Sequence, residues 1–157
     1  MSLYPEDVPF HVVKENWCTW DLGNDCILKI KLVVAKIMKP GGMPLDQVRE
    51  FKFHQQSFIS ISSPIQVKGA PETKPLTHEL IEESIIEDID PRPLTKDGNE
   101  YTLENGTIVR FSIMLTRVAR TDIFSADGTP VYAINHQIVP QIILPKKKRR
   151  RRSSPVV

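Results

Sequence analysis

The fold of this 157-residue chain is decided by residues 20–39, which read WDLGNDCILKIKLVVAKIMK. The same pattern returns 81 positions later as YTLENGTIVRFSIMLTRVAR, residues 101–120, and the alignment needs no gap. At that offset FKFHQQSFISISSP, residues 51–64, lies over YAINHQIVPQIILP, residues 132–145. The two units share seven identities in 45 aligned positions, and their charges, apolar residues and turns coincide as well. We infer an internal duplication.

Each unit is expected to form a three-stranded antiparallel meander. Its first turn is GND (23–25) or ENG (104–106), and such residues tolerate the positive φ of a tight hairpin. Apolar residues then alternate with Lys, Arg or Ser over 26–38 and 107–119, the period of a half-buried strand. In both copies the alternation reverses, near 34–36 and 115–117. A slip of one residue exchanges the faces of a strand, so the pattern predicts a β-bulge or sharp bend at each place.

The segment between the units predicts a short linking α-helix. It reads THELIEESIIEDI, residues 77–89, with Thr77 as N-cap and Ile81, Ile85 and Ile89 spaced by four. We therefore predict an all-β, mostly antiparallel fold, in which two tandem three-stranded meander repeats form a pseudo-twofold six-stranded barrel or sandwich. Repeat one spans about 17–64, the helical linker 65–98 and repeat two about 99–145, which together make a duplicated β domain of residues 1–145.

Residues 146–157 are expected to be a disordered polybasic C-terminal tail, because adjacent like charges repel and cannot pack. Without these seven cations the chain has fourteen Lys and Arg against nineteen Asp and Glu, a net charge of about −5. A polyanion is thus expected to bind the tail and not a broad basic surface. The predicted nucleic-acid-binding residues are Lys146, Lys147, Lys148, Arg149, Arg150, Arg151 and Arg152.

No motif of the sequence has the spacing of a catalytic, metal or cofactor site, so we expect a non-enzymatic protein without cofactors. The four histidines lack metal-ligand spacing. Cys18 and Cys26 flank the first turn, but the predicted register sets Cys18 opposite Lys31, so we expect two buried thiols and no disulfide. Asp46 and Asp127 occupy equivalent loops, where turn formation explains both.

Three alternatives stay open. A small-ligand binder or enzyme would have its site between the repeats, where the third strands and loops meet, with His54, His136, Asp46 or Asp127. A nucleic-acid-reading face would combine the strand cations with Phe51, Phe53 and Tyr132. A structural subunit of a larger complex would pair through exposed strand edges. Its tail would then serve for docking or import, since PKKKRRRR resembles a monopartite nuclear-import signal.

The preferred reading is a β-scaffold or assembly subunit whose tail binds RNA or DNA without sequence specificity, alone or as a homo-oligomer. We expect no membrane span, because no run approaches the roughly 20 apolar residues that a spanning helix needs. A signal peptide is not expected either. A cytoplasmic location follows, or the nucleus in a eukaryotic or viral host.

Overall fold

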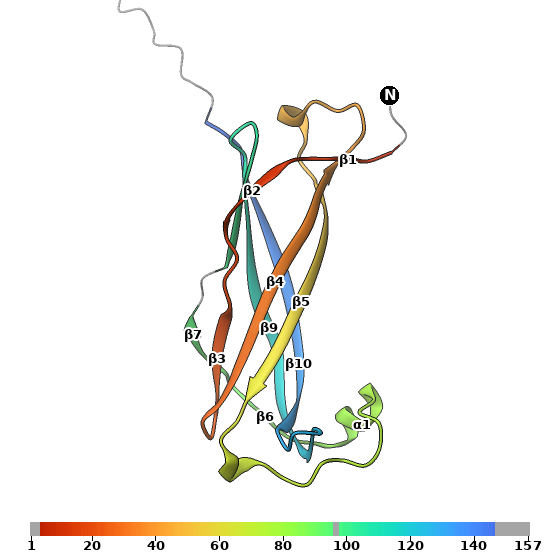
Figure 1. The fold of residues 1–157 in the computed structure, drawn as a ribbon, viewed down its shortest axis with the longest axis vertical. Coiled ribbons are helices and arrows are strands. Elements are labelled where there is room, and N and C mark those ends of the chain that lie inside the picture. Colours follow the sequence, from red (N-terminus) through yellow and green to blue (C-terminus); the bar gives the residue numbers. More distant parts are fainter. Residues whose placement is uncertain (1–3, 96–97, 147–157) are drawn as a thin grey trace, which may run out of the picture.

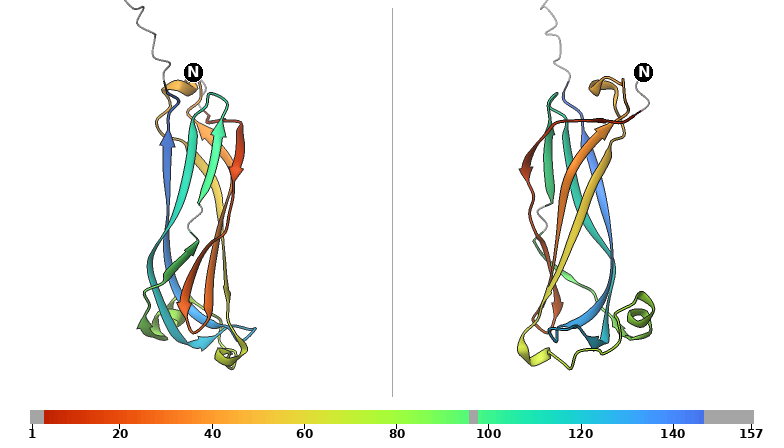
Figure 2. Two further views of the ribbon diagram at one scale, coloured as in Figure 1. Left: turned by 90° about the vertical axis from the view of Figure 1, so that its left-hand side faces the viewer. Right: turned by 45° about the vertical axis from the view of Figure 1, so that its right-hand side comes forward.

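The computed structural model of the protein describes residues 4–95 and 98–146. These residues form ten strands in two antiparallel five-stranded sheets. The first sheet contains β1 (Glu6–Asp7), β3 (Cys18–Gly23), β4 (Cys26–Lys39), β5 (Lys52–Ser62) and β7 (Arg92–Thr95). The second contains β2 (Phe10–Lys14), β6 (Ile85–Asp88), β8 (Asn99–Leu103), β9 (Ile108–Phe124) and β10 (Pro130–Ile143). Figures 1 and 2 show an elongated two-layer sandwich, its strands running along the long axis.

The two predicted meanders are present, one in each sheet. Strand β4 pairs with β3 and β5, and β9 pairs with β8 and β10. The all-β antiparallel class is confirmed, and a sandwich, not a closed barrel, is formed by the part of the chain that the structure describes. The six predicted strands correspond to β3, β4, β5, β8, β9 and β10, and four further strands of two to five residues extend the sheets.

Both predicted bulges are confirmed. The β4–β5 register shifts between Val34 and Lys36, and the β9–β10 register shifts between Leu115 and Arg117. These two positions are separated by the same 81 residues as the sequence repeat. Beyond the bulges Ile37 and Val118 are buried, so the bend returns an apolar side chain to the core.

The two first turns differ in detail although their sequences align. In the first, Asn24 and Asp25 have φ of 51° and 60°, and Gly23 pairs with Cys26, which makes a two-residue hairpin loop. In the second, Gly106 has φ of 88° and its N–H donates to the Leu103 carbonyl. Glycine at that position accepts the left-handed conformation without steric cost.

The linking segment differs from the prediction. Of the predicted helix 77–89 only His78–Glu83 is α-helical (α1), and Thr77 caps it by accepting a 3.2 Å hydrogen bond from the Leu80 N–H. Ile85 begins strand β6, which pairs with β9, and β7 then pairs with β3. A six-residue helix is too short to be stable alone. Residues 85–88 instead form backbone hydrogen bonds with β9, and these bonds would be lost if the helix continued through them. The linker is therefore partly sheet.

The core lies between the sheets. One cluster joins Leu32, Val34 and Ile37 to Tyr101, Val109 and Phe111, and a second joins Trp20, Leu28 and Ile30 to Val118 and Tyr132. Each cluster takes side chains from both sheets, so burial of these faces holds the layers together.

One long side of the sandwich is closed by a polar network; we name it the closed edge, consisting of Glu15, Leu32, Val34, Asn99 and Tyr101. The Tyr101 hydroxyl donates to the Glu15 carboxylate at 2.7 Å, and Glu15 also accepts the Val34 N–H. The Asn99 amide donates to the Leu32 carbonyl at 2.6 Å and to the Tyr101 hydroxyl at 2.9 Å. Along this side the chain passes from β2 to β3, between the sheets.

The opposite side, with β5 in one sheet and β10 in the other, we name the open edge. Each of these strands has a single partner strand within residues 4–95 and 98–146. Figure 1 shows β5 and β10 together on one side and β2, β3 and β7 on the other.

Candidate functional site

The polybasic tail leaves the sandwich at the end of β10. Lys146 is exposed and follows three residues after Ile143. The six other predicted nucleic-acid-binding residues, Lys147–Arg152, lie outside the described residues. Strand β10 runs away from α1, so Lys146 lies about 40 Å from the α1 end of the sandwich, given roughly 3.3 Å per strand residue.

The basic strand residues are mostly neutralised by carboxylates of the same domain. Lys39 lies 2.8 Å from Glu6, and Arg110 lies 2.6 Å from Glu100. The other ion pairs are Lys36–Asp7, Arg92–Asp21, Arg117–Glu82, Arg117–Asp88 and Arg120–Glu87. The Lys39 ammonium, with the Gly42 N–H, lowers the pKa of Glu6. Of the ten Lys and Arg residues in the described strands, four form no ion pair with a described carboxylate: Lys14, Lys29, Lys31 and Lys52.

The aromatic residues expected on a nucleic-acid-reading face belong to the core. Phe53 packs edge-on against Phe111 with ring centroids 4.8 Å apart, and Phe51 lies beside it. Tyr132 is buried. This expectation was wrong because the inward positions of β5 and β10 contact the opposite sheet, which sequence alternation alone does not reveal near a bulge.

The exposed aromatic residues are others. Trp17 is 42% exposed, and the Lys31 ammonium lies 5.9 Å from its ring centre. Phe58, 47% exposed, pairs with Lys31 across the β4–β5 ladder. Trp20, by contrast, is a core residue. Lys31 thus lies between two exposed rings on the outer face of the first sheet, a small patch that the sequence pattern did not indicate.

The four residues of the alternative site do not meet. Asp46 accepts a 2.9 Å hydrogen bond from Asn105, just before β9, whereas Asp127 follows the other end of that 17-residue strand. His54 pairs with Lys36 in the first sheet, and His136 pairs with Leu115 in the second. No catalytic arrangement of these four residues is formed.

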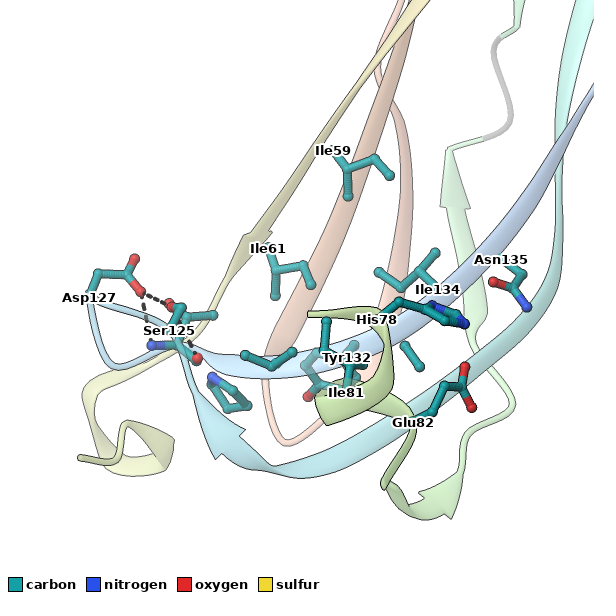
Figure 3. A pocket seen from close by; sticks show the side chains of 14 residues that line it. Ile59, Ile61, His78, Ile81, Glu82, Ser125, Asp127, Tyr132, Ile134 and Asn135 are labelled. Carbon is teal, nitrogen blue, oxygen red and sulfur yellow. Dashed lines mark hydrogen bonds between the residues drawn. The ribbon is translucent and has the colours of Figure 1, made fainter. Parts of the chain in front are cut away.

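A cavity of about 430 Å³ nevertheless opens where the two third strands come together. It lies on the open edge between β5, α1 and β10. Figure 3 shows its apolar middle, with Ile59 and Ile61 from β5 and Ile134 from β10. Asp127 and Ser125 lie at one end, and His78, Glu82 and Asn135 lie at the other. The cavity lies between the repeats, where the alternative of a small-ligand binder or enzyme would have its site. Of the four residues predicted for that site, only Asp127 lines the cavity.

The polar groups of the cavity are partly occupied by local structure. The Asp127 carboxylate accepts hydrogen bonds from the Ser125 hydroxyl at 2.5 Å and the Thr129 N–H at 3.0 Å. These bonds lower the pKa of Asp127 to about 2, the Ser125 bond contributing most. Glu82 pairs with Arg117 at 3.1 Å. Such a cavity can hold a small molecule with an apolar body and polar ends.

Cys18 and Cys26 are buried thiols and form no disulfide. Gly23 opposes Cys26 as expected, but Cys18 opposes Ile30 and not Lys31. The register shift between Asp21 and Gly23 accounts for the difference of one residue.

Within the described ranges, no three His, Cys, Asp or Glu side chains gather as a metal ion would require. The same ranges contain no helix that is both long and apolar enough to cross a bilayer.

The chain matches no protein-family model, no curated protein and no solved structure.

Proposed function

We propose that the chain is a non-enzymatic β-sandwich scaffold whose tail, Lys146–Arg152, binds nucleic acid without reading its sequence. The observation that carries the proposal is the run of seven consecutive cations beside a domain of net charge about −5. Phosphates are the densest anions that such a run can meet along a chain, and contacts to phosphate carry no sequence information.

The ion pairs of the strands support the assignment of binding to the tail. Six of the ten Lys and Arg residues in the described strands already face a carboxylate, so these six offer little net charge to a polyanion. The net negative sandwich would repel nucleic acid at distances within about one Debye length, roughly 8–10 Å at ordinary salt. The tail starts at the end of β10, where its charges can act apart from that surface.

Fluorescence anisotropy with labelled single-stranded RNA and duplex DNA tests the proposal. If all seven cations neutralise phosphates of a duplex, log K should fall against log salt with a slope near −6. The matched control keeps the length of the tail and replaces residues 146–152 by glutamine; it should not bind. Lys29→Gln with Lys31→Gln in the full chain should leave binding unchanged. Equal binding by the full chain and the glutamine control would contradict the proposal.

A second candidate is a structural subunit of a larger complex, with the tail as a docking or import signal. The long unpaired edge of β5 favours this function. Full-length protein that fails to bind either nucleic acid, yet concentrates in the nucleus of a eukaryotic cell only with the tail intact, would support it.

The cavity on the open edge favours a third candidate, the binding of a small amphipathic ligand. Binding of the dye anilinonaphthalene sulfonate can be compared between the wild type and Ile61→Arg, which places a charge in the apolar middle. The matched control is Val12→Arg, an exposed strand position away from the cavity. Loss of dye binding in Ile61→Arg alone would support a ligand site.

A further inference from the structure

The two strands of the open edge differ in how well they resist pairing with a further strand. A strand at the edge of a sheet presents unpaired N–H and C=O groups, and proteins usually block such edges with prolines, charges, bulges or covering elements. Strands β5 and β10 are long, with 11 and 14 residues, and each has one free side in the described structure.

The β10 edge carries several of these protections. Pro140 lies within the strand and has no N–H to donate. The register break between Asn135 and His136 has its counterpart between His54 and Gln55 of β5, so it does not distinguish the two edges. Helix α1 lies against the lower part of the strand, where His78, Ile81 and Glu82 line a cavity with it. A further strand could not pair continuously along β10.

The β5 edge has no proline, and its one charged residue is Lys52 at the start of the strand. From Phe53 to Ser62 the sequence is FHQQSFISIS, without proline, glycine, Lys, Arg, Asp or Glu. Its register with β4 is unbroken from Gln55 to Ser62. The absence of proline and charge from Gln55 to Ser62, with an unbroken register, leaves this edge able to pair with a further strand.

The side chains of β5 are incompletely covered on both faces. Ile59 pairs with the fully buried Ile30 and points to the core side of the sheet, yet it is 47% exposed. Phe58 on the outer face is exposed to the same extent. A strand added next to β5 would cover both residues, because cross-strand neighbours lie about 4.5–5.5 Å apart.

We propose that β5 pairs antiparallel with β5 of a second copy of this chain, around a twofold axis at Ser57, so that the two first sheets become one. Ser57 is the midpoint of Lys52–Ser62, so this register uses the whole strand, with about ten backbone hydrogen bonds. A twofold axis makes the same surface serve both partners.

The chemistry of the strand favours a second copy as the partner. In this register Ile61 lies opposite the partner's Phe53, and Phe58 opposite the partner's Gln56. The one charged residue, Lys52, lies opposite the partner's Ser62, so no like charges meet. Because β5 has only one charged residue, it cannot select a foreign strand by complementary charges. Two copies of β5 can pair without placing like charges opposite each other.

The pairing also sets the positions of the tails. An antiparallel β5 pair turns the second copy end for end, so its Lys146 lies at the far end of the dimer from the first. Under the proposed function this gives two nucleic-acid contacts per particle, which raises avidity. This consequence rests on the proposed function, but the pairing itself does not.

The first test is the mass of the full chain in solution by sedimentation equilibrium, at a salt concentration that suppresses tail contacts. We expect twice the 17.9 kDa of one chain. Phe58→Lys places a charge on the edge and should give the monomer. The matched control is Val139→Lys, which charges an outer residue of β10 that is 38% exposed and should stay dimeric. A monomeric wild type, or a Phe58→Lys variant as dimeric as the wild type, would overturn the proposal.

The second test determines, by disulfide cross-linking, the register in which the two β5 strands pair. Ser57→Cys places two thiols opposite each other at the twofold axis and should form a disulfide-linked dimer under mild oxidation. Ser60→Cys, whose partner residue is His54, should not. Circular dichroism confirms that each variant is folded. Equal cross-linking of both variants would show random collision and would rule out the register; loss of the tail should change neither result.

Discussion

The closed edge and the open edge seal the same core by different means. At the closed edge Glu15, Asn99 and Tyr101 connect the two sheets with hydrogen bonds of 2.6–2.9 Å, and Tyr101 is fully buried. At the open edge an inward-pointing Ile59 is half exposed, and a cavity of about 430 Å³ separates β5 from β10. The closed edge is built for stability, because a satisfied polar network specifies one arrangement of the sheets.

The comparison also locates the surfaces that are available for binding. Incomplete burial, a strand with one free side in the described chain and a cavity between the two sheets coincide at the open edge. A second cavity of about 420 Å³ lies beside Asn99, where Lys14, Arg110 and Val139 also line it. The closed edge thus contributes a satisfied polar network to stability, and the open edge is where we propose that a second copy pairs. Variants at the two edges should separate these roles.

The largest effect is expected from Tyr101→Ala at the closed edge. The change removes a ring that packs edge-on against Phe10 and Phe111 and breaks the hydrogen bonds to Glu15 and Asn99. The free energy of unfolding should fall by about 3–5 kcal/mol. Ile59→Ala at the open edge should cost about 1 kcal/mol, because the side chain is half exposed. Urea denaturation at low protein concentration measures both, and similar losses would contradict the comparison.

The second-largest effect is expected at the closed edge at alkaline pH, where the free energy of unfolding should fall. Burial, and then the hydrogen bond to the Glu15 carboxylate, raise the pKa of the Tyr101 phenol, and burial also raises the pKa of Tyr132. A raised folded-state pKa gives stability that is complete below the ordinary value of about 10 and is lost as the pH rises beyond it. The free energy of unfolding should therefore decline above about pH 10.

The measurement is urea denaturation at several alkaline pH values, with phenolate formation followed by near-ultraviolet absorbance. Tyr101→Phe should lose about 1–3 kcal/mol near neutrality, because Glu15 and Asn99 lose a partner. It should also decline less steeply with pH than the wild type. An equal slope would show that Tyr101 does not control the alkaline transition.

A smaller effect is expected at the open edge in acid. Since the pKa of Asp127 is lowered to about 2 in the folded protein, its contribution is complete above the ordinary value of 3.8 and is lost as the pH falls through 2. Asp127→Asn should be less stable than the wild type at neutral pH, and the difference should shrink toward pH 2. Thermal unfolding of both proteins between neutral pH and pH 2 tests this prediction. If the difference in stability did not depend on pH, the substitution would act through the shape of the side chain and not through its charge.

The smallest effect is expected from the surface ion pairs beside the closed edge. Arg110 is half exposed and pairs with Glu100. Glu100→Gln should change the free energy of unfolding by less than about 1 kcal/mol. A double-mutant cycle with Arg110→Gln isolates the interaction, and a coupling well above that value would show that the strand cations stabilise the fold.

Much of the fold could be predicted from the repeat. Strand alternation, the two turns and the two bulges depend on residues close in the chain. Each of these features occurs twice, 81 residues apart, so each prediction was supported by both copies of the repeat. The prediction failed at Ile85–Asp88, where the spacing of isoleucines resembled a helix. There the pairing with Thr121 and Arg120 in β9 decided the structure, and no local pattern reports such a partner.

The candidate sites show the same limit. The tail is predicted from charge alone, because a run of seven adjacent cations can be read directly from the sequence. The place of the cavity between the third strands was expected for the alternative site, but its lining was not, because Ile61, His78 and Asn135 come from three distant segments. Phe53 and Phe58 have the same side chain on one strand, yet one packs in the core and the other is exposed, according to the face that the β4 register gives them.

The sequence by itself determined the strands, their bends, the duplication and the separation of an acidic domain from a basic tail, since these depend on period, turn chemistry and net charge. Only the tertiary structure decided that the repeats stack as two sheets, that Glu15, Asn99 and Tyr101 close one side, and that β5 has β4 as its single partner strand within the described residues. The physical reason is that pairing and burial are properties of two segments together, and the free energy of their contact appears in neither segment alone.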